Sequence, residues 1–280
     1  MTESAASIAA RLGLRRIGRE WRGACPACGY KAGLTVTEKA GRPLWWCASC
    51  RDQTAVTAAI CGDAAPAAPR DAAPPADTSD KIAAALRLWD AAMPAEGSPV
   101  VPYLAGRGLD LPERAPLRFF PLAKHPSGRR LPCMVALLHD AEGRPVAVHR
   151  TFLHVGRDAV TKAEAEPVRM TLGPVRGAAV RLWPAAPRLV VAEGIETTIA
   201  AAMLLRLPAW AAVSAGNLGE ALALPPAVRE VLIAADADAP GREAARQAAR
   251  RWKAEGRAVR VAMPDREGQD FNDVLRERRT

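Results

Sequence analysis

Two short cysteine pairs near the N-terminus restrict the fold more than any other feature of the chain. Cys25 and Cys28 form one CxxC pair, and Cys47 and Cys50 form a second. Eighteen residues separate the pairs, a spacing at which four thiolates can surround one tetrahedral zinc ion. So short a segment lacks a sizeable core, and a bound metal replaces part of it. The sequence therefore predicts a structural zinc site.

The residues between the cysteine pairs indicate a β-hairpin. Residues 33–37 and 44–46 are strand-like and flank a turn at 41–43, so the unit resembles a zinc ribbon. A redox pair or disulfides are the alternative, although two matched pairs in an intracellular chain favour a metal. Cys61 and Cys133 fit neither pattern, and we expect them to be small buried residues.

Charge and aromatic residues suggest a polyanionic partner for this N-terminal segment. The chain of 280 residues has a formal net charge of +9. Residues 1–62 hold nine basic and four acidic residues, a net of +5, whereas 186–280 hold fourteen and thirteen, a net of +1. Lys and Arg clusters bind phosphates, but a GC-rich genome also enriches arginine. Of Trp45 and Trp46, one can pack inward while the other stacks on an unpaired base, or both can pack in the hairpin.

The chain divides by composition into four stretches and has an α/β fold class. Residues 1–62 form the zinc ribbon, and 63–80, rich in Ala, Pro and Asp, form a flexible linker. Short apolar runs in 81–186 predict an α+β segment with a mixed sheet. Strands alternate with helices in 187–280, which predicts a parallel, Rossmann-like sheet. No apolar run reaches the length of about 18 residues that a membrane span needs, so we expect a cytoplasmic protein.

The expected elements follow from apolar periodicity. A helix over 81–93 is expected to take Asp80 as its N-cap. Strands are expected at 134–138, 145–153, 178–182, 189–192, 210–213, 231–235 and 259–262, and further helices at 195–205, 218–222 and 241–255.

Three acidic residues follow two of the buried strands. Glu193 follows the strand at 189–192, and Asp236 and Asp238 follow the strand at 231–235. Ligands of open parallel sheets bind at the carboxyl ends of the strands, so these carboxylates can meet in one crevice. They repel one another unless cations intervene, which favours Mg²⁺ or Mn²⁺ and metal-dependent phosphoryl transfer. Alternatively, Asp236 and Asp238 only cap the following helix.

An EG pair after one strand and a DxD after a later strand resemble the Toprim domain of primases, topoisomerases and some nucleases. The resemblance implies that Glu193 is the catalytic acid/base and also belongs to the magnesium or manganese site, in which Asp236 and Asp238 are catalytic metal ligands. The string GQDFNDVL resembles the acidic turn of phage primases, which implies Asp270 as a further metal ligand. We expect Asp273 to cap the final helix.

Two nearby residues depart from the pattern or fit it only loosely. Glu196 stands where bacterial replicative primases show a different residue, so it either reaches the metal site or faces solvent on the first helical turn. Asn217 lies in the string SAGNL after the second strand, where a tight loop fits. It is a possible site residue.

Basic residues mark the middle segment. The strings VHRTFL and RMTLGPVRGAAVRL resemble the segment before the Toprim domain in phage and plasmid primases. Taken singly, such residues are also compatible with solvated surface charges, but together they can hold a nucleoside triphosphate or template phosphate. The candidates are His149, Arg150, Lys162, Arg169 and Arg176. Arg242, Arg246 and Arg250 are instead expected on an exposed helix face, opposite the core residues Ala245, Ala249 and Trp252.

The resemblance implies a DNA primase that makes short RNA primers from nucleoside triphosphates, with the zinc ribbon recognising single-stranded DNA. No GxxxxGK[ST] phosphate loop is present, so we expect a separate helicase partner. Two alternatives remain open. A Toprim nuclease would use the same acids to cleave phosphodiesters, and a non-catalytic accessory protein would only bind single-stranded DNA.

Overall fold

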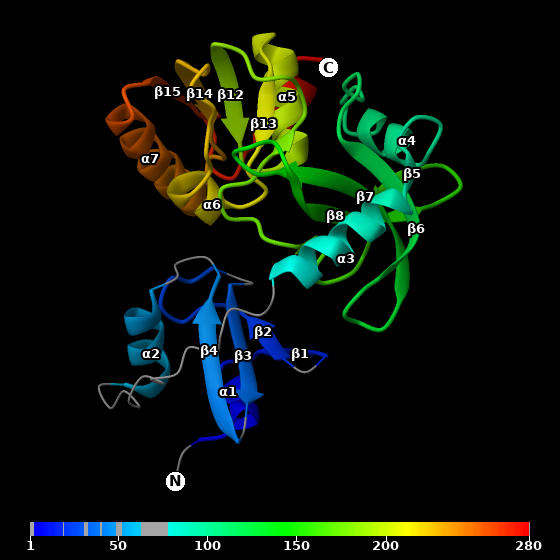
Figure 1. The fold of residues 1–280 in the computed structure, drawn as a ribbon. Coiled ribbons are helices and arrows are strands. Elements are labelled where there is room, and N and C mark those ends of the chain that lie inside the picture. Colours follow the sequence, from blue (N-terminus) through cyan, green and yellow to red (C-terminus); the bar gives the residue numbers. More distant parts are fainter. Residues whose placement is uncertain are drawn as a thin grey trace. The chain divides into compact units, whose positions relative to one another are not determined.

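The computed structural model of the chain divides into two units, shown in Figure 1. One unit comprises Met1–Ala76 with Pro126–Arg129, and the other comprises Asp77–His125 with Arg130–Thr280. The predicted boundary between residues 186 and 187 therefore falls inside the larger unit. The residues that the structure describes are 3–18, 20–30, 33–39, 41–48, 52–62 and 78–279. Of the predicted linker at 63–80, only residues 78–80 are among the described residues.

The N-terminal unit is a four-stranded antiparallel sheet with two helices. Its strands follow the order β1-β2-β3-β4. The elements are α1 (Ala5–Arg11), β1 (Arg15–Ile17), β2 (Glu20–Gly23), β3 (Leu34–Lys39), β4 (Arg42–Cys47) and α2 (Gln53–Cys61).

The predicted hairpin is present, but its turn is shorter than predicted. Lys39 pairs with Arg42, and Pro43 pairs with Glu38 inside β4, so the turn does not extend over 41–43. Because β4 is an edge strand of the sheet, a proline without an N–H is tolerated there.

One face of this small sheet carries its core. Leu34 and Val36 of β3 are fully buried against Ile8 of α1 and against Val56 and Ile60 of α2. The two helices are thus the cover that a small sheet needs for its apolar face.

The larger unit begins with a second, antiparallel sheet. Its strand order is β10-β8-β7-β6-β5, with β9 paired to β8, and every pair is antiparallel. The prediction of a mixed sheet is therefore wrong, because hairpins join β6, β7, β8 and β9 in sequence. The strands are β5 (Met93–Pro94), β6 (Leu117–Lys124), β7 (Arg130–His139), β8 (Pro145–Val155), β9 (Val160–Lys162) and β10 (Arg169–Leu172).

Two helices accompany this sheet, α3 (Thr78–Asp90) and α4 (Val100–Ala105). Asp80 lies in the first turn of α3 and is not its N-cap, because the helix begins three residues earlier than predicted.

The C-terminal sheet has the order β11-β13-β12-β14-β15. All its pairs are parallel except that of β11 with β13, so the predicted α/β class is confirmed. The elements are β11 (Val180–Arg181), β12 (Arg188–Ala192), α5 (Ile195–Leu205), β13 (Ala209–Ala211), α6 (Ala215–Glu220), β14 (Glu230–Ala234), α7 (Ala239–Ala254), β15 (Ala258–Ala262) and α8 (Phe271–Glu277).

Alternate residues of β12 face two different cores. Val190 joins a cluster with Ile199 of α5, whereas Val191 joins a cluster with Trp252 of α7. The two helices therefore cover opposite faces of the sheet, as Figure 1 shows. The predicted core side of α7 is confirmed, because Ala245 and Trp252 are buried.

The cluster on the α5 side continues into the antiparallel sheet, since Tyr103, Leu138 and Phe271 all belong to it. The middle segment and the C-terminal sheet thus share one core. None of the described helices is both long and apolar enough to cross a membrane.

Candidate active site and cysteine cluster

Three of the four predicted zinc ligands meet at one end of the N-terminal sheet. The Sγ atoms of Cys25, Cys28 and Cys47 all lie within 4.8 Å of one another, and those of Cys28 and Cys47 are 3.8 Å apart. Zinc bonds of about 2.3 Å at tetrahedral angles place sulfurs about 3.8 Å apart, so the geometry fits zinc. The fourth predicted ligand, Cys50, lies outside the described residues.

The backbone around Cys25 forms a tight turn that supports this cluster. The Gly29 N–H donates to the Cys25 carbonyl at 2.8 Å, and the Cys25 N–H donates to the Tyr30 carbonyl at 3.0 Å. Burial raises the pKa of the Cys25 thiol, while the N–H groups of Cys28 and Ala27 lower it. Main-chain donors aimed at a sulfur are what a metal-bound thiolate needs.

The other face of the same sheet carries two arginines and an exposed tryptophan, although Arg22 is paired with Glu20 at 2.8 Å and Thr35 is buried. Residues directly opposite each other on antiparallel strands share a face. Arg15 pairs with Arg22, Arg22 with Thr35, and Thr35 with Trp46, so these four residues form one row across the sheet. Trp46 is 40% exposed, whereas Trp45 points to the other face and donates from Nε1 to Thr57 at 3.1 Å.

In the larger unit, the strand order creates a crevice where the acidic residues lie. β12 is the direct neighbour of β14, yet the chain leaves β12 toward α5 and leaves β14 toward α7, on the opposite face. Such a divergence opens the sheet at the carboxyl ends of the strands. Glu193 directly follows β12, and Asp236 lies two residues beyond the end of β14. The two segments therefore meet at this crevice.

Asp236 is surrounded by like charges. Burial raises its pKa to about 7, assisted by the negative charges of Glu193, Asp270 and Asp238, while the positive charge of Arg169 lowers it. Its Oδ1 atom is buried and has no hydrogen-bond partner among the described residues. A buried carboxylate oxygen without a donor fits a site that takes up a cation.

Glu193 shares this environment. Burial raises the pKa of its carboxyl, Arg169 lowers it, Asp238 raises it, and a hydrogen bond from the Ala215 N–H lowers it. The four acids Glu193, Asp236, Asp238 and Asp270 and the cation Arg169 are thus brought together. We call the four acids the acidic group.

Two members of the acidic group also cap helices. Asp238 accepts the Gly241 N–H at 2.7 Å, at the start of α7. At the start of α8, the Asp270 carboxylate accepts the Asp273 N–H at 2.9 Å, and the Asp273 carboxylate accepts the Asp270 N–H at 3.1 Å. The N-cap of α8 is therefore Asp270 and not Asp273. Asp273 is the third residue of the helix and completes the capping box with Asp270. A carboxylate has a second oxygen, so capping leaves one for a metal.

The turn between Asp236 and α7 depends on Gly241. A Cβ atom there would lie 2.5 Å from the Asp236 carbonyl oxygen and 2.9 Å from Asp238 Oδ1. Only glycine permits this approach. The acids are nevertheless spaced more widely than the cysteines, which are the only described set of three ligand atoms within 4.8 Å of one another.

Glu196 does not face solvent, which corrects one of its two predicted positions. It is buried, accepts the Tyr103 hydroxyl at 2.5 Å and pairs with Lys162 Nζ at 3.1 Å. Although burial raises its pKa, the charge of Lys162, the Tyr103 hydrogen bond and the charge of Arg169 outweigh burial and lower the pKa to about 2. Glu196 is therefore ionised and occupied by partners from the middle segment.

Only three of the five predicted basic residues lie near the acidic group. Arg169 is exposed beside the acidic group. Lys162 forms an ion pair with Glu196, whose pKa Arg169 also lowers. His149 is buried, contacts Thr171 Oγ1 through Nδ1 at 3.2 Å, and has its pKa lowered to about 4, first by burial and then by Arg169. These three surround the same crevice.

Arg150 and Arg176 lie elsewhere. Arg150 follows His149 in β8 and so points to the opposite face of the sheet, where it is buried over the Phe152 ring and donates to the Lys124 carbonyl at 3.3 Å. Arg176 pairs with Glu220 of α6 at 3.8 Å. The structure does not bring either residue to the acidic group, and strand alternation in the sequence could have separated Arg150 from His149.

Tyr103 and the Ala215 N–H were not predicted as site groups. Nothing in the sequence around Tyr103 marks it, because its partner Glu196 lies 93 residues further on. The Ala215 donor belongs to the SAGNL string, where the position of a loop at the sheet edge was the available signal.

Two family models match the larger unit. Residues 188–280 match a family described as the Toprim domain, and residues 79–182 match a domain of unknown function, DUF7146. No curated protein matches the chain.

Solved structures similar to the chain include three primases. A DNA primase domain from Pseudomonas aeruginosa is 18% identical with a TM-score of 0.48, over 70% of this chain and 74% of that chain. The primase fragment of the bacteriophage T7 primase-helicase protein is 16% identical with a TM-score of 0.47, over 92% and 95%. The Aquifex aeolicus primase, with its zinc-binding and RNA polymerase domains, is 15% identical with a TM-score of 0.47, over 96% and 79%.

Proposed function

We propose that this chain, whose residues 188–280 form a Toprim domain, is a DNA primase that joins ribonucleotides into short RNA primers on single-stranded DNA. The observation that carries the proposal is the acidic group at the crevice beside Arg169. Asp236 Oδ1 is buried there without a donor among the described residues. Carboxylates for metal ions next to cations for a triphosphate are what phosphoryl transfer needs in one site.

The acidic residues have distinct roles in this proposal. Asp236, Asp238 and Asp270 would hold Mg²⁺ or Mn²⁺, and these ions, when bound, would supply charge stabilisation to the attacking and leaving oxygens. Glu193 would accept the proton of the attacking hydroxyl. Burial raises the pKa of its carboxyl, and a base works best when its pKa approaches the working pH.

The cations beside the acidic group would orient the triphosphate. The Arg169 guanidinium makes no hydrogen bond or ion pair with a described residue, and Arg169 is exposed. Lys162 is 30% exposed and pairs with Glu196 through one of its three donors. Guanidinium and ammonium donors are the usual partners of phosphate oxygens. His149, neutral at pH 7 because its pKa is about 4, would add a hydrogen bond without adding charge.

The N-terminal unit would hold zinc and bind the DNA template. In the row of Arg15, Arg22, Thr35 and Trp46, Arg15 would be a cation for phosphates and Trp46 an exposed indole for an unpaired base, the combination used for single strands. Arg22 would join them on leaving Glu20. A helicase would be a separate partner, and the reaction would take place in the cytoplasm, where template and nucleoside triphosphates are found.

A Toprim nuclease is the nearest alternative, because Glu193, Asp236 and Asp238 would serve it equally well. The cations Arg169 and Lys162 favour the primase, since a nuclease has no triphosphate to hold. An accessory protein that only binds DNA would have no use for a buried, donor-free Asp236 oxygen.

One experiment tests the proposal against these alternatives. The zinc-loaded full chain is incubated with single-stranded DNA, labelled ribonucleotides and Mg²⁺ or Mn²⁺, and the products are separated by length. We expect metal-dependent oligomers that are lost in Asp236→Asn and kept in Asp265→Asn, because Asp265 is an exposed acid in the loop between β15 and α8. Shortened template without oligomers would show the nuclease, and DNA binding without either product would show the accessory role.

A further inference from the structure

The turn between β13 and α6 lies against both the main chain and the side chain of Glu193. Val213 has a φ of 59°, a left-handed conformation that β-branched residues rarely adopt. Its N–H donates to the Glu193 carbonyl oxygen at 2.8 Å. Two residues further on, the Ala215 N–H lies close enough to the Glu193 carboxylate to lower its pKa. A strained turn in this position must be held by its surroundings.

The side chain of Asn217 holds the turn. Its Nδ2 donates to the carbonyls of Ala178 at 2.8 Å and Ala212 at 2.9 Å, and its Oδ1 accepts the Gly177 N–H at 2.9 Å. Asn217 is buried. Ala212 immediately precedes Val213, so the amide fixes the peptide from which the left-handed turn starts.

The chemistry of these contacts requires an asparagine. Two carbonyls need donors and one N–H needs an acceptor, and among side chains of this size only Asn offers both. Both Nδ2 hydrogens are already used, so Asn217 has no donor left for a bound ligand. The residue predicted as a possible site residue thus acts on the site through the turn.

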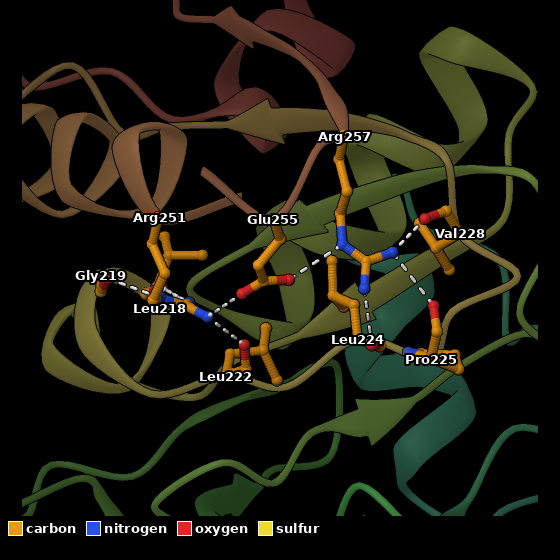
Figure 2. Close-up of polar contacts among 9 residues, drawn as sticks. All are labelled: Leu218, Gly219, Leu222, Leu224, Pro225, Val228, Arg251, Glu255 and Arg257. Carbon is orange, nitrogen blue, oxygen red and sulfur yellow. Dashed lines mark hydrogen bonds and ion pairs between the residues drawn. The ribbon is translucent and has the colours of Figure 1, made fainter. Parts of the chain in front are cut away.

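The other end of α6 is held by a different set of contacts, shown in Figure 2. Arg251 donates to the Leu218 carbonyl at 3.2 Å and the Leu222 carbonyl at 2.8 Å. Glu255 pairs with Arg251 at 3.5 Å and accepts from Arg257 at 3.0 Å. These contacts anchor the same helix without touching the Val213 turn, which makes Arg251 a matched control.

We propose that Asn217 is a positioning residue that holds residues 212–215, so that the Val213 N–H fixes the main chain of Glu193 and the Ala215 N–H orients its carboxylate toward the other three acids of the acidic group. The inference rests on the proposed function for the metal-binding role of that group. A carboxylate held by a fixed donor does not have to be ordered when a metal binds, and the partners of metal ligands affect affinity for this reason.

The test measures Mn²⁺ affinity of the zinc-loaded full chain by calorimetry. Asn217→Ala releases the turn, and Ala215→Pro removes only the donor. Proline is tolerated at the first residue of a helix, and the extended backbone of Ser214 (φ −161°, ψ 149°) is compatible with a following proline. We expect each variant to lose about tenfold in Mn²⁺ affinity. Neither should lower the affinity further when combined with Glu193→Gln.

Arg251→Met should bind Mn²⁺ like the unmodified chain, even if it melts at a lower temperature. Wild-type affinity in Ala215→Pro, an additive loss with Glu193→Gln, or an equal loss in Arg251→Met would each overturn the inference. If Asn217→Ala does not fold, Ala215→Pro decides alone. Primer synthesis is assayed separately: its absence from a chain that passes these tests removes the proposed function and leaves the role of Asn217 in place.

Discussion

The cysteine cluster and the acidic group are both candidate metal sites, but they are built in opposite ways. The cysteine sulfurs of Cys25, Cys28 and Cys47 gather within 4.8 Å, on a turn and a hairpin strand close in sequence. Glu193, Asp236 and Asp270 come from three separate connections of a parallel sheet, and their oxygens stay further apart. Closed thiolate sets are typical of structural zinc, and open carboxylate sets are typical of catalytic Mg²⁺.

The buried acids beside the crevice also differ in how their negative charge is compensated. In the acidic group, Asp236 is held without a donor on one buried oxygen, while the nearby Glu196 is matched by Lys162 and Tyr103. An unmatched acid costs stability and leaves room for a cation, whereas a matched one only ties segments together. The comparison teaches that burial alone does not identify the reactive acid.

The largest expected effect is that of zinc removal, which should act on the cysteine cluster and leave the acidic group unchanged. Removal of zinc, by a chelator or by Cys25→Ser, should unfold the N-terminal unit, because zinc binding contributes roughly 10 kcal/mol to folding in such small units. Zinc content and far-ultraviolet circular dichroism measure this. Mn²⁺ affinity of the larger unit should stay unchanged. A zinc-free chain that keeps its N-terminal sheet would contradict the structural role of the metal.

The second prediction concerns the matched acid. Lys162→Met should destabilise the larger unit by about 3–5 kcal/mol, because it leaves the buried Glu196 carboxylate without its cation. Glu196→Gln should cost about 1–2 kcal/mol less than this, because Lys162 is 30% exposed and can extend into water. Urea unfolding measures both. The double variant should recover part of the loss, and equal losses in the two single variants would contradict the buried pair.

The third prediction concerns the unmatched acid. The pKa of Asp236 is raised to about 7 from an ordinary value of 3.8, so the folded chain binds a proton that the unfolded chain has released. This contribution to stability grows as the pH falls from above 7 toward 4, and the ionised carboxylate destabilises the fold at higher pH. Asp236→Asn should therefore stabilise the metal-free site at pH 8 by about 2 kcal/mol, half of the upper limit that the shift implies.

Unfolding of the zinc-loaded chain by urea at pH 5 and pH 8, without added Mg²⁺, measures the effect of Asp236→Asn. The gain should be small at pH 5, where Asp236 is protonated in the wild type. A gain that does not change with pH would show that the carboxyl is not strained by its neighbours.

The smallest expected effect lies on the N-terminal sheet. Trp46→Ala should weaken binding of single-stranded DNA by about 1 kcal/mol, the lower end of base stacking on an aromatic ring, and leave the melting temperature nearly unchanged. Trp45→Ala is the matched control, because Trp45 packs in the core and donates to Thr57. It should lower the melting temperature instead. Fluorescence anisotropy of a labelled oligonucleotide measures the affinity.

Most local features of the larger unit could be predicted from the sequence. The bounds of α5, Ile195–Leu205, agree with the prediction, because a glycine precedes the helix and its apolar periodicity is strong. The four parallel strands were also predicted to within two residues at each end. The antiparallel sheet was harder, since β6 and β10 were not predicted and hairpin pairing is not visible in short apolar runs.

The partners of the charged residues could not be predicted from the sequence. Glu196 has the same local pattern whether it faces water or a buried lysine, and only its contact with Lys162 and Tyr103 decides. Asn217 likewise looked like a loop residue. Its three hydrogen bonds, two to the adjacent residues Gly177 and Ala178 and one to Ala212, gave it another role.

The sequence by itself determined that carboxylates end two buried strands and that cysteines pair at zinc spacing, because both patterns are local. The tertiary structure decided that β12 lies beside β14, which brings Glu193 to Asp236. It also decided which acid is matched by a cation and which is not. The physical reason is that a charge interacts through space, so its partners depend on strand order and register rather than on position along the chain.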